Sequence, residues 1–194
     1  MNLILMIDVS GSMNGHKIGA VNDAMENLKD ALIDYSSSNE SVSVSVMLFS
    51  KTAYWMHDKE LSIEDFDWIA PESTGMTSLG KACLLLSDKL NSEDKIYDIL
   101  LLSDGCPTDD YDEGIETLDS LSVFQNARRF AIAIGEDADI PSLVRFTSDA
   151  QKVFKVSDLN DLINVMTSAL QINQSQQTVD PITIITNPES DEWD

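Results

Sequence analysis

Oxygen-bearing side chains crowd the loop that follows the first apolar segment. The loop reads Asp8-Val-Ser-Gly-Ser-Met13, so the carboxylate of Asp8 and the hydroxyls of Ser10 and Ser12 lie close together in the chain. Mg²⁺ is small and hard, prefers six oxygen ligands and keeps waters readily. Two hydroxyls can bind such an ion without neutralising it, while carboxylates hold its waters. The ion then has a position for one anionic oxygen from outside.

The same loop has a simpler structural explanation. Aspartate and serine favour helix N-caps and tight turns, so this stretch could join a strand to a helix without binding anything. The choice depends on whether the fold brings further oxygen ligands to the same place.

Strands are expected where apolar residues run on without interruption or alternate with polar ones. These segments are Leu3–Ile7, Val42–Phe49, Ile96–Leu102, Phe130–Ile134 and Lys152–Val156, with Thr52–Met56 as a short antiparallel edge strand. Helices are expected where apolar residues recur at helical spacing. These segments are Ile18–Tyr35, Leu79–Leu90, Tyr111–Asn126, Ile140–Phe146 and Leu159–Leu170. The segment Leu61–Trp68 is ambiguous.

This alternation predicts an α/β fold: a Rossmann-like, doubly wound, mostly parallel sheet with one antiparallel edge strand and helices on both faces. Ligands bind such sheets at the carboxyl ends of strands. Two polar loops are expected there, the loop that begins at Asp8 and the loop after Leu102, which reads Ser103-Asp104-Gly105. We expect one domain over residues 1–172 and an acidic tail over residues 173–194.

The composition limits the kinds of partner. Lys and Arg number 12 against 34 Asp and Glu, a net charge of -22, and hydrophobic residues make up 43% of the chain. The hydrophobic content indicates a globular protein. Nucleic acid and anionic membrane surfaces are not expected partners, because both are bound by basic faces. A partner should be basic or should bind through a cation.

Targeting and redox signals are sparse. No apolar run reaches the roughly 20 residues of a membrane span. The first run, Leu3–Ile7, is too short for a signal peptide and follows no basic segment, so a cytoplasmic location is expected. Cys83 and Cys106 give neither a disulfide framework nor zinc spacing. We expect Cys83 in the core and Cys106 as a plain thiol in a loop.

The first loop resembles part of the metal-ion-dependent adhesion site (MIDAS) of von Willebrand factor A (vWA) domains. Asp8, Ser10 and Ser12 match the Asp-x-Ser-x-Ser signature of that site. The order and spacing of the remaining motifs match as well, over roughly residues 2–170. The resemblance is nearest to the bacterial tellurite-resistance (TerY-like) type.

Two later segments carry the rest of this resemblance. Gly75-Met-Thr-Ser-Leu-Gly80 looks like the family's Gly-Gly-Thr-x-Leu-Gly, with Thr77 as the threonine ligand, although Met76 stands where glycine is frequent. Leu101-Leu-Ser-Asp-Gly-Cys-Pro-Thr-Asp109 looks like the segment with the last ligand, which is Asp104 here. Thr77 could also cap the helix that starts near Leu79, a role compatible with metal binding.

The resemblance implies one Mg²⁺ ion, or Mn²⁺ in its place, bound through Ser10, Ser12 and Thr77 with Asp8 and Asp104 in support. It also implies a protein partner that offers an Asp or Glu to the metal, and so an interaction module that is not an enzyme. Relatives of the tellurite-resistance type occur with kinase- and phosphatase-like partners. An assembly or regulatory subunit of a bacterial stress or defence system is therefore the expected role.

An NTPase is one rival interpretation. Gly75 to Ala82 nearly matches the P-loop pattern G-x-x-x-x-G-K-[ST]. Ala82 stands where a hydroxyl should bind Mg²⁺, and the preceding residues, Pro71–Thr74, do not form a buried apolar strand. A vestigial site in a purely structural subunit is another alternative, although all five ligand positions are intact.

Hydrolase and phosphotransferase chemistry are weaker alternatives. Neither Ser10 nor Ser12 lies in the Gly-x-Ser-x-Gly of a nucleophile elbow. A phosphotransferase that used Asp8 would want a second acid at position 10. His16 and His57 have no second histidine at ligand spacing, so surface or turn roles are expected for both.

Two acidic segments allow more than one interpretation. Asp109, Asp110 and Asp112 are expected to form a solvated loop. In the tail, the β-prone run Ile182–Ile185 is followed by acidic residues and Trp193, which favours docking to a partner or a neighbouring copy. A solvated terminus is the alternative for the tail.

Overall fold

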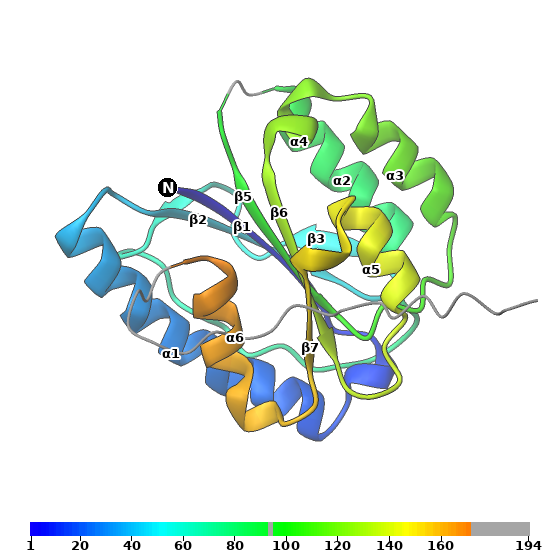
Figure 1. Ribbon diagram of the computed structural model, residues 1–194, viewed down its shortest axis with the longest axis horizontal. Helices are drawn as coiled ribbons and strands as arrows, with labels where there is room; N and C mark the ends of the chain where they lie inside the picture. Colours follow the sequence, from blue (N-terminus) through cyan, green and yellow to red (C-terminus); the bar gives the residue numbers. More distant parts are fainter. Residues whose placement is uncertain (93–94, 172–194) are drawn as a thin grey trace, which may run out of the picture.

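The computed structural model describes residues 1–92 and 95–171 of the chain. Its strands are β1 (Asn2–Asp8), β2 (Ser43–Phe49), β3 (Ala53–Trp55), β4 (Leu61–Ser62), β5 (Asp98–Ser103), β6 (Arg128–Ile134) and β7 (Val153–Val156). They form one sheet in the order β3-β2-β1-β5-β6-β7, with β4 also paired to β2 (Figure 1). β3 and β4 pair antiparallel with β2, and the other pairs are parallel.

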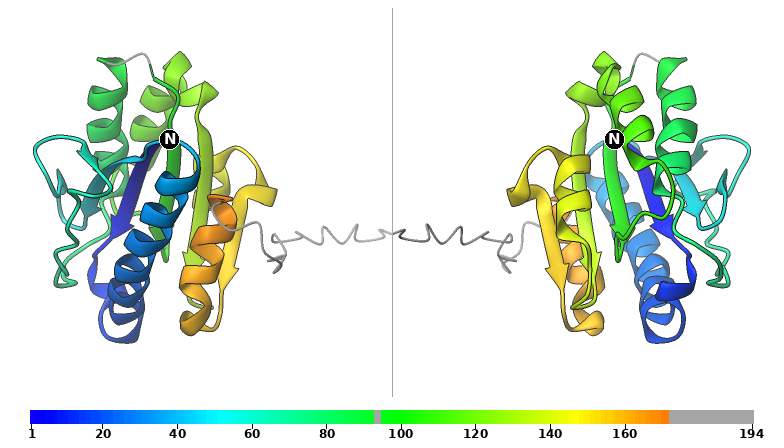
Figure 2. Two further views of the ribbon diagram at one scale, coloured as in Figure 1. Left: turned by 90° about the vertical axis from the view of Figure 1, so that its left-hand side faces the viewer. Right: turned by 90° about the vertical axis from the view of Figure 1, so that its right-hand side faces the viewer.

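Helices cover both faces of the sheet (Figure 2). The helices are α1 (His16–Ser38), α2 (Leu79–Asn91), α3 (Tyr111–Asp119), α4 (Ser122–Asn126), α5 (Ile140–Thr147) and α6 (Leu162–Ala169), with 3-10 turns η1 (Gly11–Met13), η2 (Ala150–Lys152) and η3 (Leu159–Asp161). α1 and α6 lie on one face, and α2, α3, α4 and α5 lie on the other.

The alternation of side chains along each strand divides the core into two layers. In β1, Leu3, Leu5 and Ile7 pack on the side of α1 and α6, while Ile4 and Met6 pack on the side of α2 to α5. Both faces of β1 are therefore buried, which explains its uninterrupted apolar sequence. α1 buries the repeating apolar stripe expected from its sequence.

The strand order reverses beside β1. The chain passes from β1 through α1 on one face to β2, then returns through α2 on the other face to β5. β1 and β5 are neighbours, so the loops after their carboxyl ends flank the reversal point. Ligands bind doubly wound sheets at this kind of point. The predicted fold class is confirmed, and β4 resolves the start of the ambiguous segment.

Some predicted element boundaries were wrong. Tyr111–Asn126 forms two helices, because helical structure is interrupted at Ser120 and Leu121. α4 then places Phe124 in the core. Ile96 is 73% exposed and precedes the strand, which starts at Asp98. Lys152 ends a 3-10 turn that comes before β7.

Two further expectations concern membrane segments and the tail. Over the described part of the chain, no helix has both the length and the hydropathy that a membrane span requires. The expected docking tail, including Ile182–Ile185, lies outside the described residues.

Candidate metal centre

Asp8 ends β1 and is fully buried beside β5. Its Oδ1 accepts a hydrogen bond from Ser10 N at 2.8 Å, and its Oδ2 accepts one from the Ser103 hydroxyl at 2.6 Å. Ser103 Oγ accepts in turn from Gly105 N at 2.7 Å. One carboxylate therefore joins the loop after β1 to the loop after β5, and both of its oxygens have protein donors.

Three further oxygens converge above Asp8. Ser10 Oγ and Ser12 Oγ are 2.9 Å apart, and the Ser12 hydroxyl donates to Asp104 Oδ1 at 3.0 Å. The 3-10 turn η1 follows Ser10 and buries Met13, which fixes the position of Ser12 between them. Ser10 and Asp104 are buried, whereas Ser12 is exposed. The open side of this group therefore faces solvent at Ser12.

Thr77 lies in the segment between β4 and α2, which is fastened to the first loop by its backbone. Gly11 N donates to Gly75 O at 2.9 Å, and Thr74 N donates to Val9 O at 2.9 Å. Thr77 itself is 5% exposed. The predicted site residues thus come from three loops that are hydrogen-bonded to one another at the carboxyl edge of the sheet.

Lys17, in the first turn of α1, borders this group on the side of the β6–α5 loop. Its ammonium lies 3.1 Å from Asp104 Oδ2 and 3.0 Å from Asp137 Oδ1. Burial lowers the pKa of Lys17, but its hydrogen bonds to Asp137 and Asp104 outweigh this and raise the pKa overall. The same hydrogen bond from Lys17 lowers the pKa of Asp137. Lys17 is therefore charged at neutral pH.

Burial has the opposite consequence for Asp8. Desolvation raises the pKa of Asp8, although hydrogen bonds from Ser103 and Ser10 lower it in part, and the neighbouring charge of Asp104 raises it further. Burial therefore makes ionisation of Asp8 less favourable in the metal-free protein than ionisation of an exposed carboxyl group. A divalent cation beside these two carboxylates would reverse that balance.

The donor set fits a small, hard cation. Within residues 1–92 and 95–171, His, Cys, Asp and Glu form no cluster of three that could hold a metal. Neighbouring ligands of an octahedral Mg²⁺, each at about 2.0–2.1 Å, lie about 2.9 Å apart. The 2.9 Å spacing between Ser10 Oγ and Ser12 Oγ matches that edge length, and Asp104 Oδ1 accepts from the Ser12 hydroxyl, as a supporting carboxylate would. Hydroxyl and carboxylate oxygens also suit Mg²⁺ and Mn²⁺.

Our sequence analysis missed Ser103, Thr108 and Lys17. Ser103 is a polar residue at the end of a buried strand, directly before Asp104. The Thr108 hydroxyl donates to Thr77 O and accepts from Thr77 N, both at 3.1 Å, which links the second and third loops. Lys17 had a usable signal, because a cation in the first turn of a helix opposes the helix dipole and needs local carboxylates.

The acidic segment after Asp104 is exposed at Asp110 and Asp112, as expected for solvated residues, whereas Asp109 is only partly exposed and contacts the start of a helix. Asp109 accepts hydrogen bonds from Gly80 N and Lys81 N, both at 2.9 Å, at the start of α2. Asp110 caps α3 by accepting from Glu113 N at 3.1 Å. Each carboxylate satisfies amides that a helix N-terminus leaves free.

The histidines and cysteines lie where the sequence indicates. His16 is exposed, and His57 Nε2 lies 3.3 Å from Asp67 O in a turn. Cys83 is buried, which raises its thiol pKa far above the usual range, and Cys106 is exposed.

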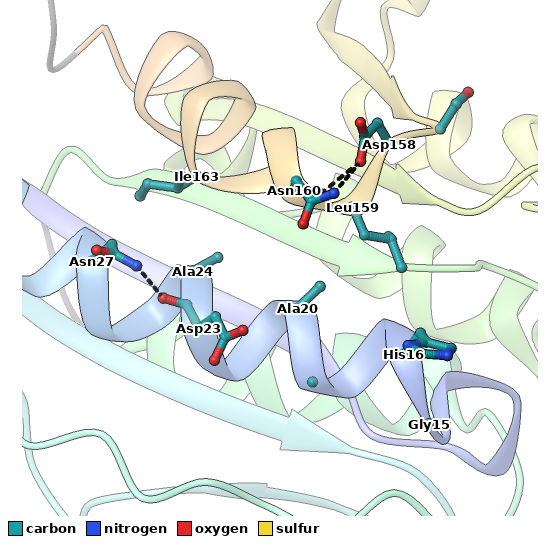
Figure 3. Close-up of a pocket in the computed structure, with 12 residues that line it drawn as sticks. Gly15, His16, Ala20, Asp23, Ala24, Asn27, Asp158, Leu159, Asn160 and Ile163 are labelled. Carbon is teal, nitrogen blue, oxygen red and sulfur yellow. Dashed lines mark hydrogen bonds between the residues drawn. The ribbon is translucent and has the colours of Figure 1, made fainter.

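A groove of about 580 Å³ runs between α1 and the connection from β7 to α6 (Figure 3). Small residues of α1, such as Ala20 and Ala24, line one wall together with Asp23, and Asp158 and Leu159 line the other. Asp158 Oδ1 is already bonded to the Asn160 backbone and side chain, at 3.0 and 2.8 Å.

The chain belongs to the von Willebrand factor type A domain family, whose model matches residues 2–168. A comparison with curated protein sequences gives no significant match. The finer assignment to the tellurite-resistance type has no support from these comparisons.

Solved structures share the fold. Proximal thread matrix protein 1 from the mussel byssus is similar with a TM-score of 0.69 and 19% identity, over 88% of this chain and 45% of that one. A structure of the same protein with a zinc-occupied MIDAS motif has a TM-score of 0.65 and 18% identity, over 88% of this chain and 45% of that one.

Two bacterial structures show the same likeness. A von Willebrand factor type A protein from Catenulispora acidiphila gives a TM-score of 0.68 and 18% identity, over 88% of this chain and 41% of that one. The pilus adhesin SpaC from Lactobacillus rhamnosus GG gives a TM-score of 0.71 and 14% identity, over 89% of this chain and 30% of that one. The present chain thus spans less than half the length of these structures.

Proposed function

We propose that this vWA domain is a protein-interaction module that binds one Mg²⁺ ion, or Mn²⁺, and uses it to hold a carboxylate of a partner protein. Ser10, Ser12 and Thr77 would contact the ion, and Asp8 and Asp104 would support it. The observation that carries this proposal is the spacing of the Ser10 and Ser12 hydroxyls at octahedral edge length, with Asp104 hydrogen-bonded to Ser12.

The ion's chemistry makes the partner's carboxylate the natural ligand. The hydroxyl ligands carry no charge, so none of the proposed direct ligands is an anion and the ion can take an anionic oxygen as a further ligand. The chain's net charge of -22 would otherwise repel an acidic partner. A metal-loaded site therefore provides both the attraction and a fixed point of contact. A mussel relative with a zinc-occupied MIDAS motif supports metal binding, although not the choice of Mg²⁺.

The loop contacts favour a binding module over an enzyme. In a P-loop, the amides at the start of the helix hold phosphate. Here the amides of Gly80 and Lys81 already bind Asp109. Lys81 Nζ donates to Lys51 O at 3.2 Å, and no strand directly precedes this segment. These contacts count against nucleotide binding at Gly75–Ala82.

The biological setting remains an inference from resemblance. We propose an assembly or regulatory subunit of a bacterial stress or defence system, with kinase- or phosphatase-like proteins among the partners. Its support is the sequence resemblance to the tellurite-resistance type, and direct identification of the partner would decide it.

Metal-dependent capture of the partner tests the proposed function. The immobilised full chain should retain a specific protein in Mg²⁺ and release it in EDTA, and Ser12→Ala should retain none. Ser37→Ala, at the far end of α1, is the matched control and should behave as wild type. Replacing the partner's contacting Asp or Glu by Asn or Gln should also abolish retention. Equal retention in Mg²⁺ and EDTA would refute the proposal.

A further inference from the structure

Lys17 directly contacts Asp104, one of the proposed supporting residues of the metal site, and the fold makes room for the lysine. Its side chain is only 18% exposed and bridges buried Asp104 to Asp137, whose side chain is 77% exposed. Gly135, with φ of 92°, lies against its stem, and a Cβ at that position would be 2.8 Å from Lys17 Cε. A side chain at Gly135 would therefore displace the lysine.

The bridge gives the two oxygens of Asp104 different partners. Oδ2 accepts from Lys17, while Oδ1 accepts from Ser12. The backbone of the same residue is also held, because Asp139 N donates to Asp104 O at 2.8 Å. Lys17 thus orients the carboxylate so that only Oδ1 faces the hydroxyls.

A charge count shows what Lys17 adds. The two carboxylates of Asp8 and Asp104 carry a charge of -2, which one divalent ion cancels. Lys17 then leaves the loaded site with a charge of +1. Asp137 opposes this only weakly, because an exposed carboxylate is screened by water and salt. A second anion, such as a carboxylate from outside, is attracted to a site of charge +1 more than to a neutral one.

We propose that Lys17 is a positioning residue that orients Asp104. Its charge lowers the affinity of the site for the divalent ion and raises the affinity of the loaded site for an external carboxylate. This proposal rests on the proposed function, since it concerns the same metal. It predicts effects of opposite sign on two ligands, which a purely structural lysine would not produce.

The test uses the full chain and two defined probes, Mg²⁺ and acetate. Calorimetry measures the Mg²⁺ affinity in 200 mM acetate and in chloride of equal ionic strength, corrected for Mg²⁺ bound by acetate in solution. Linkage requires that an anion which prefers the loaded site strengthens Mg²⁺ binding by the same factor as Mg²⁺ strengthens anion binding. The ratio of the two Mg²⁺ affinities is therefore a measure of carboxylate capture.

Lys17→Met should bind Mg²⁺ about three- to tenfold more tightly in chloride, because a neighbouring positive charge is gone. The acetate effect, which is the ratio of the Mg²⁺ affinity in acetate to that in chloride, should fall to near one for this variant. Lys17→Arg should keep the wild-type pattern. Asp137→Asn should weaken Mg²⁺ binding slightly and keep or increase the acetate effect, because it removes the opposing charge.

Lys29→Met is the matched control for the overall charge. Lys29 lies on the same helix and pairs with Asp67 at 2.8 Å, away from the metal loops, so neither measurement should change. Weaker Mg²⁺ binding by Lys17→Met, or an acetate effect equal to wild type, would overturn the role of Lys17 while leaving the metal site intact. A wild-type chain that binds no Mg²⁺ would overturn the proposed function itself, and a wild-type chain that binds Mg²⁺ without an acetate effect would overturn carboxylate capture.

Discussion

The loop cluster consists of the loops after β1 and β5 and the segment that carries Thr77. It offers a ligand oxygen donors, whereas the groove beside α1 offers a ligand an open hollow. The groove is a hollow of about 580 Å³ whose wall on α1 includes Ala20 and Ala24, and Asp158 on the other wall is already hydrogen-bonded to Asn160. In the loop cluster, side chains from separate segments converge at hydrogen-bonding distance on Ser12. The groove is distinguished by its volume and the loop cluster by its oxygen donors. Substitutions in the loop cluster should therefore change Mg²⁺ binding, and substitutions in the groove should not.

The largest expected effect is on metal binding by the cluster. Ser12→Ala should weaken Mg²⁺ binding at least about a hundredfold, because it removes a proposed direct ligand, a change larger than the 10–100-fold cost of losing a supporting group. Its melting temperature in EDTA should stay near that of wild type, since Ser12 is exposed. Calorimetry and thermal melts measure the two quantities. An unfolded variant would show that Ser12 serves the fold.

Asp8→Asn should weaken Mg²⁺ binding but raise the stability of the metal-free protein. Mg²⁺ affinity should fall by about 10–100-fold, as expected for a supporting carboxylate. Burial raises the pKa of Asp8 above 3.8, so its contribution to stability is fully present below pH 3.8 and is lost as the pH rises through the higher folded-state value. At neutral pH in EDTA the variant should therefore melt at a higher temperature than wild type.

Melting curves in EDTA between pH 4 and pH 7 check the sign. The advantage of Asp8→Asn over wild type should grow with pH, because only wild type must ionise the buried carboxylate. An advantage that shrinks as the pH rises would show that Asp8 is stabilised as the anion without metal.

A smaller effect on Mg²⁺ binding is expected at Asp109, which joins the loop after β5 to the start of α2. Asp109→Ala should lower the free energy of unfolding by about 1 kcal/mol, the usual value of a helix cap. It should also weaken Mg²⁺ binding less than tenfold, because Thr108 still holds Thr77. Asp110→Ala is the control: it removes a cap from α3 and should cost similar stability with unchanged Mg²⁺ binding. Denaturant melts and calorimetry distinguish the pair.

The smallest effect is expected in the groove. Gly19 lies within α1, and a Cβ there would meet nothing within 4 Å. Gly19→Ala should therefore stabilise the protein by about 0.5–1 kcal/mol through helix propensity and leave Mg²⁺ binding unchanged. A changed Mg²⁺ affinity would mean that the groove and the loop cluster act as one site.

The parts that could be predicted from sequence are those that local pattern determines. Apolar runs and helical spacing indicated the fold class and the polar loop of Asp8, Ser10 and Ser12, whereas Thr77 and Asp104 were predicted from the resemblance of their segments to vWA motifs. The contacts of Ser103, Thr108 and Lys17 depend on which loops meet across the reversal point. No local pattern specifies such meetings, because the partners are far apart in sequence. The break before α4 was missed because both halves share one apolar periodicity.

The segment that carries Thr77 is held by its main chain, and this has an evolutionary consequence. Bonds from Thr74 N to Val9 O and from Gly11 N to Gly75 O use no side chain of Thr74 or Met76. Both residues are exposed, and Met76 stands beside Thr77 at the rim of the metal loops. Substitutions at these two positions can therefore alter which surface is recognised around the metal while the ligands stay in place. A lineage can change its partner there by single mutations without first rebuilding the ion site.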